Sequence, residues 1–377
     1  MRILIAPNSM KGSLSAFDFA DIAEKALLDV SDEFEIRKIP IADGGDLTGE
    51  VLSRHLGAKS IEVKVSGPFG KIITSKYSIS GRIAIIEMAD SSGMKLIKAE
   101  ELNPLLASSF GTGELIKHAI ESGCSEIYLA IGGSATVDGG LGMMRALGFK
   151  LFDGEKNELK GCGQDLIHLK SIRKSTLIDN INIKIICDVD NPLLGINGAA
   201  HVFGPQKGAT SEMVDTLDKG LKNLADILLE QSGKDVRNIP GSGAAGGISL
   251  PLLAFGQAEI VPGADFICER LEVEKWTKWA DLIITGEGKI DSQTLNNKAP
   301  YAVSKLARRN RKPVLAIGGK VEVEASPAFD GCFSLVNGPV TLEDAILNAN
   351  KYLYSAVNEL GRLLLSIRKK QYLKNLK

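Results

Sequence analysis

Residues 127–142 read IYLAIGGSATVDGGLG and contain the pattern on which the predicted fold rests. The apolar run 127–131 has the composition of a strand buried in a parallel sheet. The glycines that follow allow backbone N–H groups to turn toward a ligand, and Ser134, Thr136 and Asp138 supply hydroxyls and a carboxylate. Such a loop is typical either of a phosphate site with Mg²⁺ or of a strand-to-helix turn that needs glycine for steric reasons. Composition alone leaves both interpretations open.

The order of strand, glycine-rich loop and helix recurs near both ends of the chain. Short apolar runs predict strands, and amphipathic runs with a period of 3.6 residues predict helices. In these two parts the predicted strands are 3–6, 34–41, 282–285, 313–317 and 333–336, and the predicted helices are 15–30, 47–56 and 302–309. The middle differs, because predicted strands at 61–65, 72–80 and 83–88 follow one another with only turns between them.

These patterns predict an α/β protein of two domains. The chain has 377 residues, which exceeds the ~250–300 residues at which single cores stop growing. Since the two ends look alike, we predict that residues 1–60 and 262–377 form one discontinuous, Rossmann-like domain with a parallel sheet. Residues 61–261 would then form an inserted α/β domain with a mixed sheet.

Composition argues against several classes of function. The net charge of −1 provides no field for nucleic acid or a membrane surface. No apolar run approaches the ~18 residues that span a bilayer, and the opening residues MRILIAPN lack the features of a signal peptide. The five cysteines include no C-x-x-C pair, and the four histidines show no metal-ligand spacing. We therefore expect a cytoplasmic protein that acts on a small molecule, with a homodimer as an open alternative for its assembly.

Acidic residues recur just after predicted strands, at the edge where open α/β sheets bind ligands. They are Asp43, Asp138, Asp188, Asp190, Glu287 and Asp291. Carboxylates, hydroxyls and glycines at several strand ends, without a G-x-S-x-G motif, favour phosphoryl transfer, which needs Mg²⁺, a base and hydrogen-bond donors to phosphate. Taken singly, each acid has a structural alternative as a turn or helix N-cap residue.

Two further features have competing interpretations. Four lysines in similar loops could face a phosphate or a carboxylate, although a solvated surface lysine is the default for each; they are Lys11, Lys207, Lys289 and Lys298. Residues 241–246, GSGAAG, match the dinucleotide-binding pattern G-x-G-x-x-G, with Asp265 at about the expected spacing. Because Pro240 precedes the loop and the strand that should lead into it is weak, we favour an anion-binding loop over an NAD site.

Taken in order, the motifs of residues 2–365 resemble the bacterial glycerate kinases of the type I family. The segments that carry the resemblance are IAPNSMKGSLSA (5–16), ADGGDLT (42–48), SFGTGEL (109–115), IGGSATVDGG (131–140), CDVDNPLLG (187–195), FGPQKGA (203–209), PGSGAAGG (240–247) and TGEGKIDSQT (285–294). The resemblance implies ATP- and Mg²⁺-dependent phosphorylation of D-glycerate at the 2-hydroxyl. It also implies two α/β domains, one of them Rossmann-like, with the active site in the cleft between them.

The kinase hypothesis assigns roles to individual residues. The catalytic set is Asp188, Asp291, Lys11 and Lys289, and the choice between Asp188 and Asp291 as the general base stays open. We expect the substrate to contact Asn8, Ser9, Asp43, Ser292 and Thr294. The expected nucleotide and phosphate set is Gly132, Gly133, Ser134, Thr136, Gly243, Gly246 and Gly247. Magnesium is expected at Asp188, Asp190 and Glu287.

The sequence departs from the family pattern at a few positions. Asn8 stands where the pattern has aspartate, Asp46 and Leu47 replace glutamate and glycine, and Asn297 precedes Lys298. Asn8 matters most, because an amide can neither accept a proton nor neutralise Mg²⁺ as a carboxylate does. Two alternatives therefore remain beside the 2-kinase: a homologue that binds glycerate or nucleotide with weakened catalysis, and a kinase that forms 3-phosphoglycerate.

Overall fold

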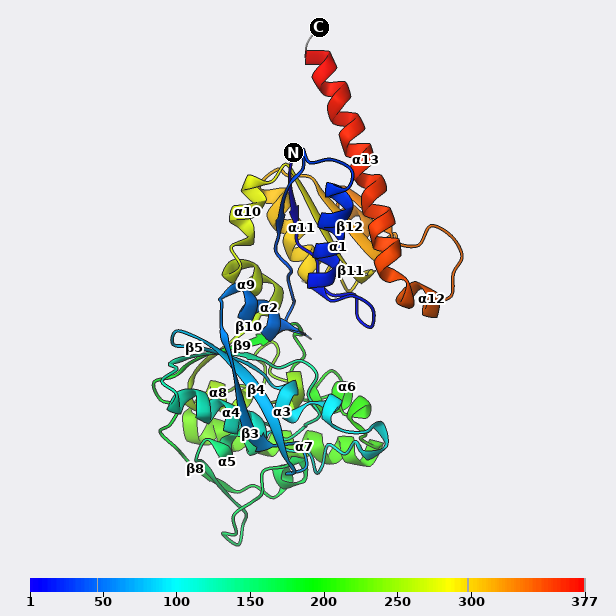
Figure 1. The fold of residues 1–377 in the computed structure, drawn as a ribbon. Helices are drawn as coiled ribbons and strands as arrows, with labels where there is room; N and C mark the ends of the chain where they lie inside the picture. The colour runs from blue at the N-terminus through cyan, green and yellow to red at the C-terminus, as the bar shows by residue number, and fades with distance from the viewer. Residues whose placement is uncertain (46, 297, 376–377) are drawn as a thin grey trace. The chain divides into compact units, whose positions relative to one another are not determined.

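The computed structural model describes residues 1–45, 47–296 and 298–375, with side chains up to residue 368 (Figure 1). The predicted α/β class is confirmed. The chain divides into two compact units: unit 1 is Met1–Asp43 together with the chain from Gly263 on, and unit 2 is Gly44–Pro262. The sequence placed these boundaries near residues 60 and 262. The first lies earlier because α2 (Thr48–His55) packs on strands of unit 2.

Unit 1 is built on a five-stranded sheet in which every strand pair is parallel. Its strands are β1 (Arg2–Ile5), β2 (Glu35–Lys38), β11 (Leu282–Ile290), β12 (Val314–Val321) and β13 (Gly331–Ser334). They lie in the order β13-β12-β11-β1-β2, so the direction of winding reverses between β1 and β11. In doubly wound sheets this switch point opens a crevice at the carboxyl ends of the two strands, where ligands bind.

The helices of unit 1 pack on this sheet or on one another. They are α1 (Ala16–Leu28), α9 (Gly263–Arg270), α10 (Val273–Trp279), α11 (Ala299–Arg309), α12 (Leu342–Leu347) and α13 (Ala349–Asn375). Helix α1 begins with the capping box of Ser15 and Asp18, which satisfies two backbone N–H groups. Its Phe19 and Leu27 belong to the same buried cluster as Leu353 of α13. The N-terminal and C-terminal segments of the chain therefore share one hydrophobic core.

Unit 2 has a six-stranded mixed sheet, as predicted for the middle of the chain. Its strands are β3 (Lys59–Ser66), β4 (Ile72–Ser80), β5 (Ile83–Glu87), β6 (Glu126–Ala130), β9 (Asn182–Cys187) and β10 (Gln257–Pro262), in the order β10-β9-β6-β5-β4-β3. The pairs β3-β4 and β4-β5 are antiparallel and the other three pairs are parallel. A separate two-stranded antiparallel sheet consists of β7 (Lys150–Phe152) and β8 (Ser171–Arg173).

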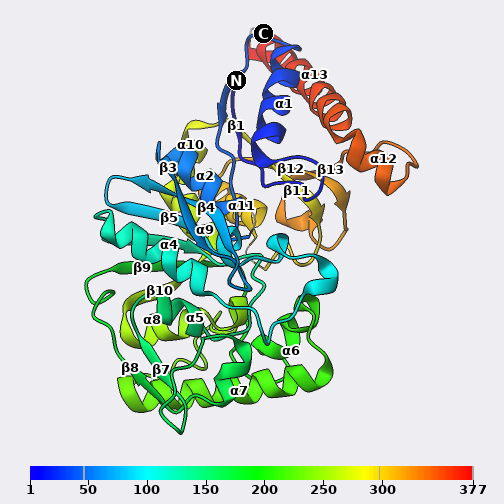
Figure 2. The same cartoon turned by 60° about the horizontal axis from the view of Figure 1, so that its bottom comes forward.

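Helices of unit 2 pack on both the antiparallel and the parallel part of this sheet or on one another. They are α2, α3 (Ala89–Ser92), α4 (Phe110–Glu121), α5 (Leu141–Ala146), α6 (Ala199–Phe203), α7 (Ser211–Ser232) and α8 (Ser249–Phe255). The long helix α7 lies beside α6 and α8 (Figure 2). Leu224 of α7 joins Leu115 of α4 and Leu129 of β6 in one buried cluster. Within the described residues, no helix is both long enough and apolar enough to cross a membrane.

Short 3₁₀ turns complete the two units. They are η1 (Met94–Leu96), η2 (Ala99–Glu101), η3 (Gly163–Ile167), η4 (Pro205–Lys207) and η5 (Ala244–Gly246) in unit 2, and η6 (Ser326–Ala328) in unit 1. Turn η4 ends at Gly208, whose φ of +90° is a left-handed conformation that favours glycine. Two of these turns matter for the site below, because η4 carries Lys207 and η5 lies against the loop that follows β6.

The backbone approach at Gly246 gives a stability prediction. This residue has a φ of +72°, and a Cβ there would lie 2.2 Å from the Thr136 carbonyl oxygen. We expect Gly246→Ala to lower the free energy of unfolding by about 3 kcal/mol, because backbone would have to move. Gly233→Ala is the matched control: Gly233 has a φ of +71° but open space around it, so the expected loss is about 1 kcal/mol. Equal losses in urea unfolding would show that the close approach is unimportant.

Candidate functional site

The carboxyl ends of β1 and β11 gather polar side chains of unit 1. Asn8 follows β1, Glu287 lies within β11, and Asp291 and Thr294 come directly after that strand. All four are buried, at 7%, 6%, 5% and 0% exposure. Buried polar groups are rare unless they are hydrogen-bonded or serve a function. The sequence predicted all four as site residues, and the structure brings them to the switch point of the sheet.

Glu287 is a buried acid whose near neighbour is a hydroxyl group. Thr294 Oγ1 donates a hydrogen bond to Glu287 Oε1 at 2.7 Å, and the Lys298 ammonium is 4.0 Å from Oε2. Burial raises the pKa of Glu287 to about 7, against the opposing effects of Thr294 and Lys298, and the negative charges of Asp43 and Asp291 raise it further. The carboxyl can therefore both gain and lose a proton near neutral pH.

Asp291 has the opposite electrostatic environment. Burial would raise its pKa, but the hydrogen bond and charge of Lys289, with backbone N–H groups of residues 293 and 294, hold the pKa below its ordinary value. Lys289 Nζ lies 2.7 Å from Asp291 Oδ2 and 3.1 Å from Glu322 Oε1. Asp291 therefore stays ionised at neutral pH. The sequence predicted Lys289 and Asp291 together but missed Glu322, because no local pattern connects that residue to the loop.

Asn8 is held by the acid that follows β2. Its Nδ2 donates to Asp43 Oδ2 at 2.9 Å, and its Oδ1 accepts from the Ser9 backbone N–H at 2.8 Å. The amide thus uses its donor and its acceptor at once, which a carboxylate at this position could not do. The departure from the family pattern at Asn8 is therefore accommodated by a specific pair of hydrogen bonds.

In unit 2, the loop after β6 is organised by a buried carboxylate. Asp138 has no exposed surface and accepts hydrogen bonds from the Ser109 backbone N–H and hydroxyl, both at 2.7 Å. It also accepts from the N–H groups of Gly140 and Gly142, at 3.0 and 3.3 Å. Burial raises the pKa of Asp138 and these four donors oppose the rise. Asp138 therefore fixes the loop rather than facing a ligand, and Ser109 is a partner that the sequence did not assign.

A buried lysine holds the other half of this loop. Lys207 Nζ donates to Ser134 Oγ and to the Thr136 carbonyl oxygen, each at 2.7 Å. The side chain is 1% exposed, and burial lowers its pKa to about 7, partly offset by the negative charge of Asp138. Among the described residues, the buried Thr136 Oγ1 meets no hydrogen-bond partner. The structure thus connects Ser134 and Thr136, two predicted phosphate ligands, to a single cation.

The glycine-rich loop 241–247 packs against the same segment. Gly139 N–H donates to the Gly246 carbonyl oxygen at 2.9 Å. The N–H of Gly243 donates to the Asn191 carbonyl and that of Gly247 to the Ala244 carbonyl, each at 3.0 Å. The N–H groups of these two glycines are therefore already hydrogen-bonded within the protein. Their predicted role as phosphate donors stays a prediction.

Three loops meet at the carboxyl ends of the neighbouring strands β6 and β9. A Cβ on Gly132 would lie 3.1 Å from the Gly45 Cα, and one on Gly44 would lie 3.3 Å from the Asp188 backbone nitrogen. Gly133 next to this junction is exposed with a φ of +68°. Residues 44–45, 132 and 187–188, which are far apart in the sequence, thus lie together at this edge of the sheet.

Comparison with known proteins agrees with this arrangement. The model of the glycerate kinase family matches residues 3–365. The chain belongs to the glycerate kinase family. It is 41% identical to a glycerate kinase of Bacillus subtilis (strain 168) over 96% of this chain and 97% of the relative. It is 40% identical to the glycerate 2-kinase of Escherichia coli (strain K12) over 93% of this chain and 94% of that protein.

A solved structure supports the same conclusion. A crystal structure described as that of a candidate glycerate kinase 2 from Salmonella typhimurium LT2 matches with a TM-score of 0.88 and 39% identity, and covers 98% of this chain and 99% of that one. The predicted resemblance is thereby confirmed, and the protein is an enzyme of the kinase class. The roles of individual residues stay predictions.

The remaining predicted site residues of this glycerate kinase family member are solvent-facing. Asp188 and Asp190 are exposed after β9, and Lys11 and Ser292 are exposed in the loops after β1 and β11. Within residues 1–45, 47–296 and 298–375, no three His, Cys, Asp or Glu side chains come together as a metal site. Two of the departures from the family pattern, Asp46 and Asn297, lie outside the described residues. Leu47 begins α2 with a φ of +65°.

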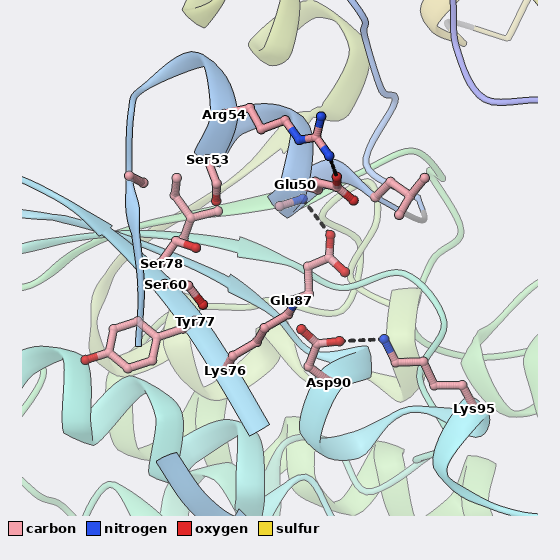
Figure 3. Close-up of a pocket in the computed structure, with 14 residues that line it drawn as sticks. Glu50, Ser53, Arg54, Ser60, Lys76, Tyr77, Ser78, Glu87, Asp90 and Lys95 are labelled. Carbon is pink, nitrogen blue, oxygen red and sulfur yellow. Dashed lines mark hydrogen bonds and ion pairs between the residues drawn. The ribbon is translucent and has the colours of Figure 1, made fainter. Parts of the chain in front are cut away.

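A pocket of about 300 Å³ lies between α2 and strands β3 to β5 of unit 2 (Figure 3). Four of its charged side chains form two ion pairs: Arg54 with Glu50 along α2, and Lys95 with Asp90. Glu87 at the end of β5 accepts from the Gly49 N–H at 2.6 Å and so caps the first turn of α2. No local sequence pattern points to this pocket, because its lining comes from six separate elements: α2, β3, β4, β5, α3 and η1.

The Asn8 geometry predicts how an acid would behave at this position. In Asn8→Asp, two carboxylates would stand where Asn8 Nδ2 now donates to Asp43, so ionising both is unfavourable. The folded-state pKa of the pair is then raised, and the free energy of unfolding should fall below that of the wild type by about 1–3 kcal/mol as pH rises from 4 to 8. Urea unfolding at several pH values measures this. Asn8→Ala, which adds no charge, should show a loss that does not grow with pH; the same slope in both variants would refute the explanation.

Proposed function

We propose that this protein transfers the γ-phosphoryl group of ATP, with Mg²⁺, to the 2-hydroxyl of D-glycerate and so forms 2-phosphoglycerate. Family membership and the name of the Escherichia coli relative, glycerate 2-kinase, support the substrate and the hydroxyl. The observation that carries the mechanism is the pair of buried acids in β11 and the loop after it, whose pKa values are shifted in opposite directions.

Glu287 is the general base of this proposal. A base that acts at neutral pH works best with a pKa near that pH, and burial gives Glu287 such a value. Asp291 is a poorer base because Lys289 keeps it ionised and weakly basic. The sequence favoured Asp291 or Asp188 as the base and placed Glu287 with the metal; the environments of Glu287 and Asp291 instead support Glu287 as the base. Deprotonation of the substrate hydroxyl by Glu287 makes it a better nucleophile toward phosphorus.

The groups around Glu287 would bind and orient glycerate. Asn8, Ser9 and Asp43 offer donors and acceptors for the hydroxyls, and Thr294 fixes Glu287 through its hydrogen bond. Lys11, exposed in the loop after β1, is a cation for the substrate carboxylate. Asp291 holds the Lys289 ammonium at the carboxyl end of β11. The positive charge of Lys289 can act there on the transferred phosphoryl group.

The loop of Gly132, Gly133, Ser134 and Thr136 would bind nucleotide phosphates. The unpartnered, buried hydroxyl of Thr136 and the left-handed turn at Gly133 are features that fit an anion-binding loop. Asp188 and Asp190 supply the hard oxygen ligands that Mg²⁺ prefers, at the strand end next to this loop. When bound with ATP, Mg²⁺ neutralises phosphate charge, and one or two carboxylates suffice to hold it beside the phosphates.

The first experiment tests the activity and its product. We expect ADP release that depends on D-glycerate, ATP and Mg²⁺, followed in a coupled assay, and a phosphorus NMR spectrum of the product that shows 2-phosphoglycerate. A spectrum of 3-phosphoglycerate would overturn the assignment of the hydroxyl. Calorimetric binding of glycerate or nucleotide without any ADP release would instead support a homologue that has lost catalysis.

The second experiment identifies the base. We expect kcat/KM of the wild type to rise with pH through about 7, because Glu287 must lose its proton to act. Glu287→Gln should lower kcat by about 10²-fold or more and abolish this rise. Asp291→Asn should retain the pH dependence, displaced to lower pH because a negative charge near Glu287 is removed, and should reduce activity because Lys289 loses its partner. A pH dependence that survives in Glu287→Gln and disappears in Asp291→Asn would assign the base to Asp291.

The third experiment concerns magnesium. Removal of Mg²⁺ by EDTA should abolish turnover, and restoring it should recover the activity. Asp188→Asn should raise the Mg²⁺ concentration for half-maximal activity by about tenfold, since it removes one charged ligand. Asp215→Asn, an exposed acid on α7, is the matched control and should leave this concentration unchanged. Identical magnesium titrations of Asp188→Asn and the wild type would remove Asp188 from the metal site.

A further inference from the structure

Lys207 is a buried cation for which the proposed reaction has so far found no use. It lies at the end of η4, with 1% of its surface exposed, and its ammonium hydrogen-bonds only to neutral oxygens among the described residues: Ser134 Oγ and the Thr136 carbonyl. Asp138 influences it through charge alone. Burying an ammonium group without a directly paired carboxylate is costly, and an apolar side chain of similar size usually stabilises a fold equally well or better. Packing therefore does not account for a lysine at this position.

The chemistry of the ammonium group determines the direction of the Ser134 hydrogen bond. In its charged form a lysine ammonium has three N–H donors and no acceptor, so in that form Ser134 Oγ is the acceptor. The hydrogen of the Ser134 hydroxyl is then free to point toward another acceptor. Phosphate oxygens are such acceptors. Ser134 directly follows the exposed Gly133, and its side chain is almost completely buried.

The second hydrogen bond fixes the backbone of the same loop. Lys207 binds the Thr136 carbonyl, two residues beyond Ser134, so one side chain holds the loop at two points 2.7 Å from its nitrogen. Between these points lies Ala135, whose N–H donates to the Ser92 carbonyl at 2.9 Å. The hydroxyl of Thr136 lacks a partner among the described residues and is the polar atom in this segment with unused capacity. A segment held this firmly that still leaves two hydroxyl hydrogens unassigned is organised for a ligand.

We propose that Lys207 is a positioning residue that holds residues 132–136 in the conformation that binds nucleotide phosphates, through its hydrogen bonds to Ser134 Oγ and the Thr136 carbonyl. The inference rests on the proposed kinase function, since it assigns the loop to the nucleotide. Lys207 itself contacts protein atoms, and its effect reaches the nucleotide through Ser134 and the loop backbone.

Lys207→Met tests the proposal, because methionine retains most of the volume and removes the donors. We expect the variant to unfold in urea at the wild-type midpoint or above it, since an unpaired buried charge is gone. The Kd for Mg·ADP, measured by calorimetry, and the KM for ATP should each rise by about tenfold, which corresponds to the loss of one hydrogen bond to a charged group. The KM for glycerate should change less than about twofold, because glycerate is assigned to residues of unit 1 and Lys207 belongs to unit 2.

Asn223→Leu is the matched control for the loss of two hydrogen bonds. Asn223 Nδ2 donates to the carbonyl oxygens of Leu166 and Leu169, each at 2.9 Å, in the same unit but apart from the loop. This variant should lose stability and keep the wild-type Kd for Mg·ADP. If Lys207→Met loses stability and leaves nucleotide binding unchanged, Lys207 is a structural residue and the proposal is wrong.

A double-mutant cycle separates the positioning role from an independent one. Ser134→Ala should weaken Mg·ADP binding on its own, and in that background Lys207→Met should add less than about threefold, because the hydrogen bond to Ser134 is already lost and only the one to the Thr136 carbonyl remains. Equal effects of Lys207→Met in both backgrounds would overturn the inference. Wild-type protein without glycerate-dependent turnover would refute the proposed function, while a nucleotide-binding defect confined to Lys207→Met and Ser134→Ala would still support the inference.

Discussion

The pairing of β1 with β11 is the constraint on which unit 1 depends. Ile3, Leu4 and Ile5 pair in parallel register with residues 282, 283 and 284, across almost 280 positions of the chain. The pairing extends past the strand, because the Ala6 and Asn8 N–H groups donate to the carbonyls of Ile284 and Gly286, each at 2.8 Å. Since β2 follows β1 on one side and β12 follows β11 on the other, this contact also creates the switch point of the sheet. The acids and the amide of unit 1 meet there because these two strands do.

Two similar, buried carboxyl groups of unit 1 have pKa values that are shifted in opposite directions. Glu287 and Asp291 are four positions apart and almost equally buried, yet one faces a threonine hydroxyl and the other an ammonium. In a poorly solvated site a single neighbouring charge decides which form of an acid is favoured. The same principle applies to the loop after β6 in unit 2, where Asp138 is surrounded by donors and Lys207 by neutral acceptors. Neither role can be assigned from the residue type alone.

Much of the fold could be predicted because it is encoded locally. Alternation of apolar runs and glycine loops gave the strands at both ends, and the consecutive runs at 61–88 gave the antiparallel part of unit 2. The domain boundary was harder to predict: residues 47–56 have a clear helical pattern, but whether α2 packs on one sheet or the other depends on contacts with β4 and β5. The pocket beside α2 could not be predicted from the sequence either, because it also depends on contacts between distant segments. Glu87, for example, caps α2 from the end of β5.

By itself the sequence determined the α/β class, the family and the set of polar residues at strand ends, because periodicity, composition and motif order are properties of the linear chain. Only the tertiary structure decided which of those residues are buried, which ones share a hydrogen bond, and in which direction their pKa values move. Glu287, Lys289 and Asp291 look alike as polar residues of one motif. Desolvation and the nearest partners, both set by the folded structure, distinguish a proton acceptor near pH 7 from an acid that stays ionised at neutral pH.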